Sequence, residues 1–294
     1  MVTCWLIVGH LYRDIIRLDM DTVNLHRFDC YSMRCIFCRQ DSSTSKTAEH
    51  IIPEALGNKK HILPRGVVCD NCNSYFGLKV ERPLLDSDYF RQARSRNLIY
   101  NKENRVPSIT GVFLPGFIPI EMMWDKEGRS MSPTRERDTS KFINVLHHIQ
   151  EGKLIVPIPE RPDELLMSKF LAKAALEVLA SLFLAVPGEL DEVIDKSELD
   201  ELRHYARFGA PPNFWPFNTR VIYPEGKMFV EGTQRYEVLH EHTLLYTESS
   251  ELYLVVAILG IEYVINMGEP KIDGYIEWLK QRSFKSPLYI NRNA

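Results

Sequence analysis

The sequence has no apolar run of the roughly 20 residues that a membrane-spanning helix needs. Its longest apolar stretch, residues 174–186, contains Glu177 and follows two lysines, Lys169 and Lys173. The opening residues also lack the basic start and the long apolar segment of a secretory signal. We therefore expect a soluble, cytoplasmic protein with no membrane partner.

Internal repeats, low-complexity tracts and a strong net charge are also absent, since 36 Lys and Arg stand against 39 Asp and Glu. The charge is unevenly distributed, however. Residues 34–106 carry 13 basic and 8 acidic side chains, whereas the rest of the chain carries 23 and 31. A locally basic module on an acidic protein suits the binding of a polyanion, and an ordinary solvated surface would give the same count.

The chain divides by composition into three parts. Residues 1–33 show no clear periodicity and are interpreted as an extension, with Met20 or Met33 as alternative starts. Residues 34–106 hold the recognisable motifs, and residues 107–294 mix helical and extended patterns. We predict an α+β protein whose C-terminal domain serves target selection, oligomerisation or regulation. The sequence does not distinguish among these three roles.

Several secondary-structure elements can be expected in the C-terminal part. Residues 107–135 are rich in Pro and Gly and predict a connector with short strands around 112–124. The clearest helical pattern covers 163–186, and a second helix is expected over 189–208. Strands are predicted over three alternating stretches, 219–232, 235–247 and 251–266. A short helix is expected after them, over 274–280.

Four of the six cysteines form two closely spaced pairs, Cys35-x2-Cys38 and Cys69-x2-Cys72. Two Cys-x2-Cys turns can place four thiolates around one tetrahedral ion, which is the pattern of a structural zinc site with no open position. In a reducing compartment such pairs are more typical of metal ligands than of disulfides. Bound zinc would stabilise a small module by on the order of 10 kcal/mol of apparent binding energy.

The 30 residues between the two pairs are more than a simple zinc ribbon needs. They contain an acid–histidine dipeptide, Glu49-His50, followed by apolar residues and the turn Gly57-Asn58. The local pattern predicts a strand, a loop and a second strand over 61–68. A helix is then expected to begin at Cys69 and to stop at Pro83.

Taken singly, Glu49, His50 and Asn73 are interpreted as a surface carboxylate that caps an amide, a buried core histidine and a helix-capping residue. Taken together, the three side chains have the chemistry for hydrolysing a phosphodiester. An imidazole with a pKa near 6.5, here that of His50, can take a proton from water at neutral pH. Carboxylate and amide oxygens, as in Glu49 and Asn73, are ligands that hard divalent ions prefer. Such an ion would stabilise the charge that develops on the phosphate and on the leaving oxygen.

These motifs together resemble the HNH endonuclease family, the zinc-containing branch of the ββα-metal or His-Me finger nucleases. The matching text is CIFC, EHIIPEALGN and VVCDNCN followed by SYFG, within residues 34–82. The resemblance implies a ββα module stapled by zinc, in which His50 is the general base and Glu49 and Asn73 hold a catalytic Mg²⁺ or Mn²⁺. It further implies DNA as the substrate and a role in restriction or in defence against phage.

The middle position of the motif, usually an Asn that orients the base in this family, is not determined by the sequence. The expected spacing falls near Pro64, whose side chain cannot serve. Asn58 and His61 are the nearest candidates.

Basic residues cluster around the motifs and are candidates for binding the nucleic-acid backbone, because phosphate contacts supply most non-specific affinity. For Arg91, Arg94 and Arg96, an ordinary solvated helix face is an equal alternative. The candidates are Lys59, Lys60, Arg65, Lys79, Arg82, Arg91, Arg94 and Arg96.

Other assignments were weighed against the nuclease. A zinc deaminase requires His-x-Glu and Pro-Cys-x2-Cys, whereas here Glu49 precedes His50 and Val68 precedes Cys69. A module that binds nucleic acid or protein without cutting remains the alternative function.

Other histidines and cysteines are expected to be structural. His147-His148 and His240-x-His242 invite a second metal site, but no third ligand is evident. Cys4 and Cys30 have no partner pair, and we expect them to be spare thiols.

Overall fold

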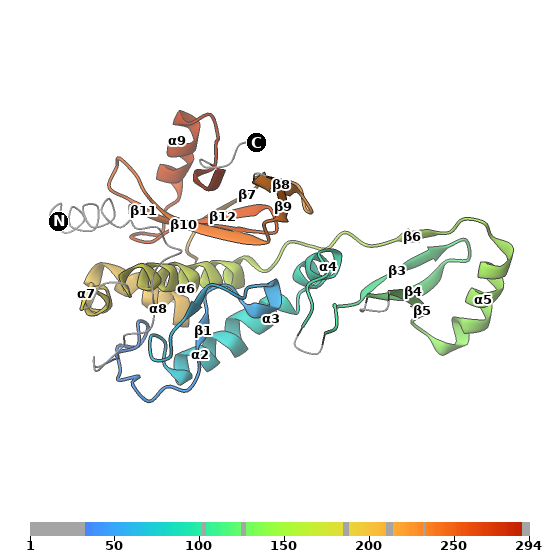
Figure 1. Cartoon of the computed structure of the whole chain (residues 1–294), viewed down its shortest axis with the longest axis horizontal. Helices are drawn as coiled ribbons and strands as arrows, with labels where there is room; N and C mark the ends of the chain where they lie inside the picture. The colour runs from blue at the N-terminus through green and yellow to red at the C-terminus, as the bar shows by residue number, and fades with distance from the viewer. Residues whose placement is uncertain are drawn as a thin grey trace. The chain divides into compact units, whose positions relative to one another are not determined.

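The computed structural model describes residues 33–101, 104–124, 128–184, 188–209, 214–231 and 233–289. The predicted extension before Met33, the start at Met20 and the two spare thiols, Cys4 and Cys30, lie outside these residues. Helices and strands are mixed along the described chain, which confirms the α+β class (Figure 1). No helix in these ranges combines the length and the apolar character of a membrane span.

The chain forms two compact units. The first takes in the described residues of Met1–Ile52, Asn58–Glu81 and Leu165–Ala294, and the second consists of Pro53–Gly57 and Arg82–Glu164. These units divide the chain at positions other than the sequence-based limits. The domains 34–106 and 107–294 therefore stay a prediction.

The motif segment of the first unit is a short hairpin followed by a helix. Strand β1 (Glu49–His50) pairs antiparallel with β2 (Ile62–Leu63), and the loop between them contains a 3₁₀ turn, η2 (Glu54–Leu56). Helix α2 (Asp70–Phe76) begins at Cys69, as expected from the sequence. The order of the elements is thus strand, strand, helix.

The helical path does not stop at Pro83, and that prediction was wrong. A π-helical turn, η3 (Gly77–Glu81), follows α2, and α3 (Arg82–Leu85) contains the proline near its start. Proline lacks an N–H and its ring collides with the carbonyl four residues back in a regular α-helix. The wider π turn just before it changes the backbone bonding at this point, so that the helical path can continue.

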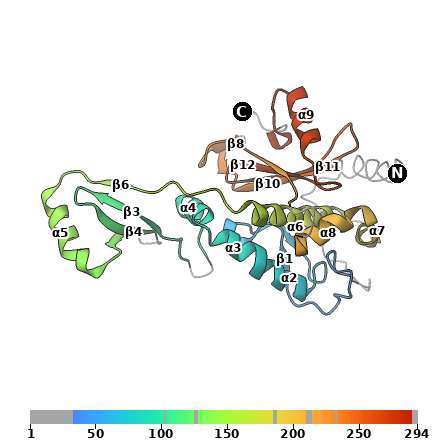
Figure 2. The ribbon, with the colours of Figure 1, turned by 180° about the vertical axis from the view of Figure 1, so that it is seen from behind.

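Helix α6 (Glu164–Phe183) is the central element of the first unit, and the helix predicted over 163–186 is confirmed. It lies between the motif segment and a four-stranded sheet (Figures 1 and 2). Because it is covered on both sides, its residues from Met167 to Ala180 are all buried. The second predicted helix is divided into α7 (Glu189–Asp195), η5 (Ser197–Leu199) and α8 (Asp200–Phe208).

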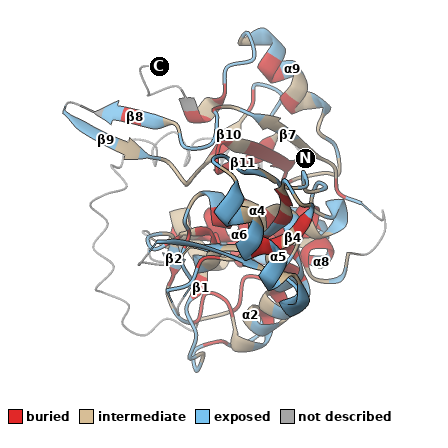
Figure 3. Ribbon diagram, turned by 90° about the vertical axis from the view of Figure 1, so that its right-hand side faces the viewer, coloured by how far each residue is buried: buried red, intermediate tan, exposed pale blue. Residues whose placement is uncertain are grey.

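The sheet of the first unit has the strand order β10-β11-β12-β7, with antiparallel neighbours throughout. Its third strand in chain order, β11, is buried along its whole length (Figure 3). Helix α9 packs on one face through Tyr275, Trp278 and Leu279. The bounds are β7 (Phe217–Val221), β10 (His240–Tyr246), β11 (Leu252–Ile258), β12 (Ile261–Asn266), the hairpin β8 (Met228–Glu231) with β9 (Gln234–Glu237), α9 (Asp273–Gln281) and η6 (Pro287–Tyr289).

The second unit contains a separate four-stranded sheet with the order β5-β4-β3-β6. The residues predicted as a connector with short strands form its central hairpin. Its small core joins Phe113, Ile118 and Ile120 of the sheet to Phe142 of α5. The bounds are α4 (Asp88–Arg96), β3 (Ile109–Leu114), β4 (Ile118–Trp124), β5 (Arg129–Pro133), η4 (Glu136–Asp138), α5 (Thr139–His148) and β6 (Lys153–Ile155).

Candidate functional site

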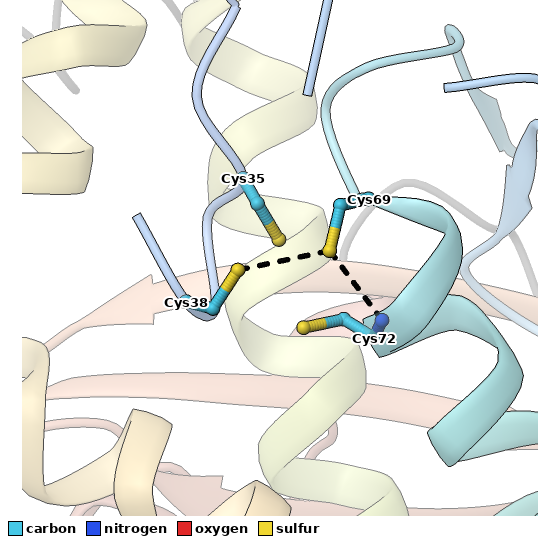
Figure 4. Close-up of side chains that lie close together, drawn as sticks. All are labelled: Cys35, Cys38, Cys69 and Cys72. Atoms are coloured by element: carbon cyan, nitrogen blue, oxygen red, sulfur yellow. Dashed lines mark hydrogen bonds between the residues drawn. The ribbon is translucent and has the colours of Figure 1, made fainter. Parts of the chain in front are cut away.

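The two cysteine pairs converge on one point at the start of α2 (Figure 4). Cys35 and Cys38 come from a tight turn, Cys69 is the N-cap of α2, and Cys72 lies in its first turn. The four Sγ atoms all lie within 4.8 Å of one another, and those of Cys38 and Cys69 are 3.6 Å apart. The cluster could therefore hold a single metal ion.

The electrostatics of the cluster also fit a cation. The hydrogen bond between Cys35 and Cys72 lowers the pKa of the Cys35 thiol to about 5. The same bond, together with burial, raises the pKa of Cys72 far above its ordinary range. Cys35 and Cys72 thus do not both ionise by themselves. A divalent ion would take the place of the thiol protons, which is the usual chemistry of a Cys4 zinc site.

Basic side chains of the C-terminal helices lie next to the sulfurs. Arg207, in α8, donates to Cys72 Sγ over 3.3 Å, and its guanidinium lies 5.7 Å from the Tyr75 ring centroid. Lys169, in α6, donates to the Tyr75 hydroxyl over 3.1 Å. Zinc bound to four thiolates carries a net charge of about −2, so these cations would reduce the cost of burying it.

The hairpin register separates Glu49 from His50. His50 pairs with Ile62, which is 39% exposed, whereas Glu49 pairs with the buried Leu63. Successive strand residues point to opposite faces, so His50 and Glu49 leave the strand on opposite sides. His50 is half-buried on the more open face, where a substrate can reach it.

Helix α2 is tied to the residues just before β1. Asn73 Nδ2 donates to Thr47 Oγ1 over 3.2 Å and to the carbonyl of Ala48 over 3.3 Å. Its amide oxygen is not used in these bonds. The carboxylate of Asp70 accepts from the Thr47 hydroxyl over 2.6 Å and from the backbone N–H groups of Lys46 and Thr47, and these bonds lower the pKa of Asp70. Sequence reasoning missed Asp70, although an acidic residue in the first turn of an expected helix is a typical helix-start signal.

Asn58 and His61, the two candidates for the middle motif position, have different surroundings. Asn58 is buried and closes the loop between the strands. Its Nδ2 donates to the carbonyls of Ile52 and His61, over 2.6 and 2.9 Å, and its Oδ1 accepts from the N–H groups of Lys60 and His61. Asn58 therefore holds the backbone that follows the Glu49-His50 dipeptide.

The ring of His61 faces two histidines of β10. Its centroid lies 4.6 Å from that of His242 and 5.5 Å from that of His240. Over the described ranges, the cysteine cluster alone brings three or more metal-binding side chains within ligand distance of one another. The pKa of His242 is lowered to about 3 by burial and by the two neighbouring histidines. Burial and the charge of Lys60 lower the pKa of His61.

The lowered pKa values of His61 and His242 predict that the protein loses stability in mild acid. The folded-state pKa values of His61 and His242 lie below the unfolded value near 6.5, so protons bind the unfolded chain more tightly. The stability contribution is complete above pH 6.5 and is lost as the pH falls toward 3. We expect the free energy of unfolding to decrease by up to about 1.4 kcal/mol per pH unit for each fully shifted histidine.

Urea unfolding at pH 7 and pH 5 measures this effect. The variant His242→Gln should reduce the difference between the two values, whereas His147→Gln, at an exposed position of α5, should leave it unchanged. An unchanged difference in His242→Gln would contradict the assignment of the acid sensitivity to this cluster.

A buried lysine holds the Glu49-His50 dipeptide from the opposite face of the hairpin. Lys173 Nζ, in α6, lies 2.6 Å from a Glu49 oxygen, 2.7 Å from Glu81 and 3.0 Å from Glu177. It also donates to the carbonyl of His50 over 3.2 Å. The side chain of Lys173 is 0% exposed and Glu49 is 4% exposed.

The charges of this cluster are strongly perturbed. Burial raises the pKa of Glu177 and, less strongly, that of Glu49. Burial alone would lower the pKa of Lys173, but the three carboxylates raise it well above its ordinary value, so the amine stays charged. Sequence reasoning missed the roles of Lys173, Glu177 and Glu81. The available signal was two charged residues, four apart, inside the most apolar helical pattern.

The predicted nucleic-acid contacts are distributed over both units. Lys59, Lys60, Arg65 and Lys79 are exposed on the first unit. In the second unit, the exposed Arg82 lies 3.7 Å from Asp86, and the half-buried Arg91 lies 3.9 Å from Asp88. Arg94 is also half-buried, its pKa is lowered by burial, and its Nε is buried without a hydrogen-bond partner. Arg96 is exposed at the end of α4.

Residues 35–88 match a family model described as HNH endonuclease. The matched range contains both cysteine pairs, the Glu49-His50 dipeptide and Asn73. It confirms the resemblance seen in the motifs: this part of the chain is similar to an HNH endonuclease domain. Comparisons with curated proteins and with solved structures found no match.

Proposed function

We propose that the protein is a metal-dependent HNH endonuclease that hydrolyses phosphodiester bonds of DNA. The observation that carries this proposal is the family match over residues 35–88, which contain a histidine on the open face of a hairpin beside a four-cysteine cluster. An HNH domain indicates nuclease activity and a nucleic-acid substrate. The choice of DNA comes from the resemblance.

His50 is proposed as the general base. A neutral imidazole on the accessible face can accept the proton of the attacking water, and such a base typically contributes about 10² to 10⁴ in rate. Asn58 supports this role because it fixes the loop that leaves the strand of His50. His61 is the second candidate for the orienting position. It lies at the end of this loop, where its carbonyl accepts from Asn58 Nδ2 and its backbone N–H donates to Asn58 Oδ1.

Glu49 and Asn73 are the proposed ligands of a catalytic Mg²⁺ or Mn²⁺. The Asn73 amide oxygen takes no part in its two hydrogen bonds, but Glu49 is buried against Lys173 on the face opposite to His50, so Glu49 would have to leave this ion pair to reach a metal ion beside His50. When bound, a hard divalent ion supplies charge stabilisation for the phosphate and the leaving oxygen. The four cysteines would hold zinc that shapes the domain.

The exposed lysines and arginines around the motif are proposed to bind the DNA backbone through phosphate contacts. We also propose the cytoplasmic setting expected from the sequence and, from the resemblance, a role in restriction or phage defence. The region after residue 106 is proposed to select the target, to oligomerise or to bind a regulatory partner.

A plasmid-nicking assay with Mg²⁺ or Mn²⁺ tests the proposal directly. We expect His50→Ala to lower the nicking rate by about 10² to 10⁴. Its zinc content and melting temperature should equal those of the wild type, because the ring leaves the hairpin on its open face. His148→Ala, at an exposed position of α5, is the matched control and should cut normally.

Equal nicking by His50→Ala and the wild type would overturn the role given to His50. Tight DNA binding by the wild type without any cleavage, at every divalent ion tried, would favour the non-catalytic binding module instead.

A further inference from the structure

The middle position of the HNH motif falls near a proline, so this chain must orient its base by other means. Asn58 holds the loop after the strand of His50, but none of its four bonds reaches the dipeptide itself. Strands β1 and β2 are only two residues long each. A hairpin of this size holds a side chain poorly unless another element supports it.

Lys173 provides that support from helix α6. Its ammonium contacts the side chain of Glu49 and the backbone carbonyl of His50, so both residues of the dipeptide are held from one point. An ammonium has only three donors, and four acceptors surround it here. Its side chain is fully buried in the middle of a 20-residue helix, which leaves it little freedom to move.

The other carboxylates keep Lys173 in place. Glu177 lies one helical turn after it in α6, and Glu81 comes from the π-helical turn after α2. Three carboxylates around one ammonium exceed what charge balance requires, and Glu177 Oε1 has no hydrogen-bond partner. Removing the ammonium would leave the Glu49 carboxylate beside two others with no cation.

We propose that Lys173 is a positioning residue of the nuclease motif and that, together with Asn58, it supplies the orientation that the middle motif position would give. This inference rests on the proposed function of His50. It makes α6 part of the catalytic domain, because a displacement of this helix would move the backbone that carries the base. A misplacement of about 1 Å can cost on the order of 10²-fold in rate.

The test compares three full-length variants. Lys173→Met with Glu177→Leu removes the ammonium and one carboxylate together, which avoids three carboxylates without a cation. Lys173→Arg keeps the charge but not the shape of the donor. Lys280→Met is the control, since Lys280 is exposed in α9 of the same unit and its ammonium pairs with Glu277 instead of the dipeptide.

Two measurements are made on each folded, zinc-containing variant: the single-turnover nicking rate with its half-saturating protein concentration, and the NMR signals of ¹³C-labelled histidine. The His50 signal is assigned from its loss in His50→Gln. We expect the double variant to lower the maximal rate by at least about 10-fold with unchanged half-saturation. Its His50 signal should shift or broaden, Lys173→Arg should be intermediate, and Lys280→Met should match the wild type.

A wild-type maximal rate and an unshifted His50 signal in the double variant, or in Lys173→Arg where the double variant does not fold, would overturn the inference. If the wild type cuts no DNA, the proposed function fails, and the NMR measurement alone decides about Lys173. An unshifted His50 signal then overturns the positioning role, and a shifted one supports it.

Discussion

Replacing Cys69 by serine is expected to release the zinc and to unfold the motif segment. The change removes one of four sulfurs that lie within 4.8 Å of one another, and an incomplete site holds zinc far less tightly. Structural zinc contributes on the order of 10 kcal/mol of apparent binding energy, which is as large as the whole stability of an ordinary domain. No other single substitution considered for this chain is expected to have a larger effect.

Cys69 also caps helix α2, so its replacement affects the stability of the helix as well as the metal site. It is the N-cap of α2, and its Sγ accepts a hydrogen bond from the backbone of Cys72 over 3.4 Å. Serine can cap a helix, so this contribution would survive the substitution in part. The expected unfolding therefore measures the metal site more than the cap.

Metal analysis and thermal unfolding by circular dichroism test this expectation. Cys69→Ser should contain no zinc and should lack the thermal transition in which the motif segment of the wild type unfolds. A strong chelator should have the same effect on the wild type. Ser74→Ala, at an exposed position of the same helix, should keep both the zinc and the transition. A zinc-free Cys69→Ser with an unchanged melting temperature would contradict the structural role of the metal.

The isolated fragment 34–106 is expected not to fold, even with zinc present. Its motif segment is completed by residues beyond 164, which belong to the same compact unit. Arg34 pairs with Asp191 and Asp195 of α7 over 2.8 Å, and the buried Arg203 of α8 donates to the carbonyl of Ile36 over 2.9 Å.

The fragment would also expose groups that only the C-terminal helices cover. Glu49 would lose its ion pair with Lys173, and the carbonyls of Ile36 and His50 would lose their donors. Buried apolar side chains of the segment, such as Phe37 and Phe76, would lose part of their covering. A buried polar group that loses its partner costs about 1 to 3 kcal/mol, and several are lost at once.

Heteronuclear NMR of the zinc-loaded fragment measures the outcome. We expect a narrow, poorly dispersed amide spectrum, and added residues 107–294 should restore dispersion if the two pieces associate. A well-dispersed spectrum of the fragment alone would show that the domain limits predicted from the sequence describe an independent folding unit.

Local patterns predicted the elements whose signals lie within one segment. The apolar patterns of α6, β11 and β12 are such signals, because burial on both faces leaves a nearly continuous apolar sequence. The helix break at Lys196 and the helical path through Pro83 were not predicted. At Lys196 the backbone carbonyl accepts from the Arg203 side chain, and at Pro83 a π-helical turn precedes the proline, and local preferences predict neither.

The sequence by itself determined the chemistry of the domain, and the tertiary structure decided how that chemistry is supported. Cys-x2-Cys spacing and the Glu49-His50 dipeptide act over a few residues, so their geometry follows from local turns. The contact of Lys173 with that dipeptide joins residues 123 apart in the chain, and that of Arg207 with Cys72 joins residues 135 apart. No spacing rule reaches so far. These partners are brought together by the burial of α6 and α8 in one compact unit, because a charge inside it must find an opposite charge or a polar atom within reach.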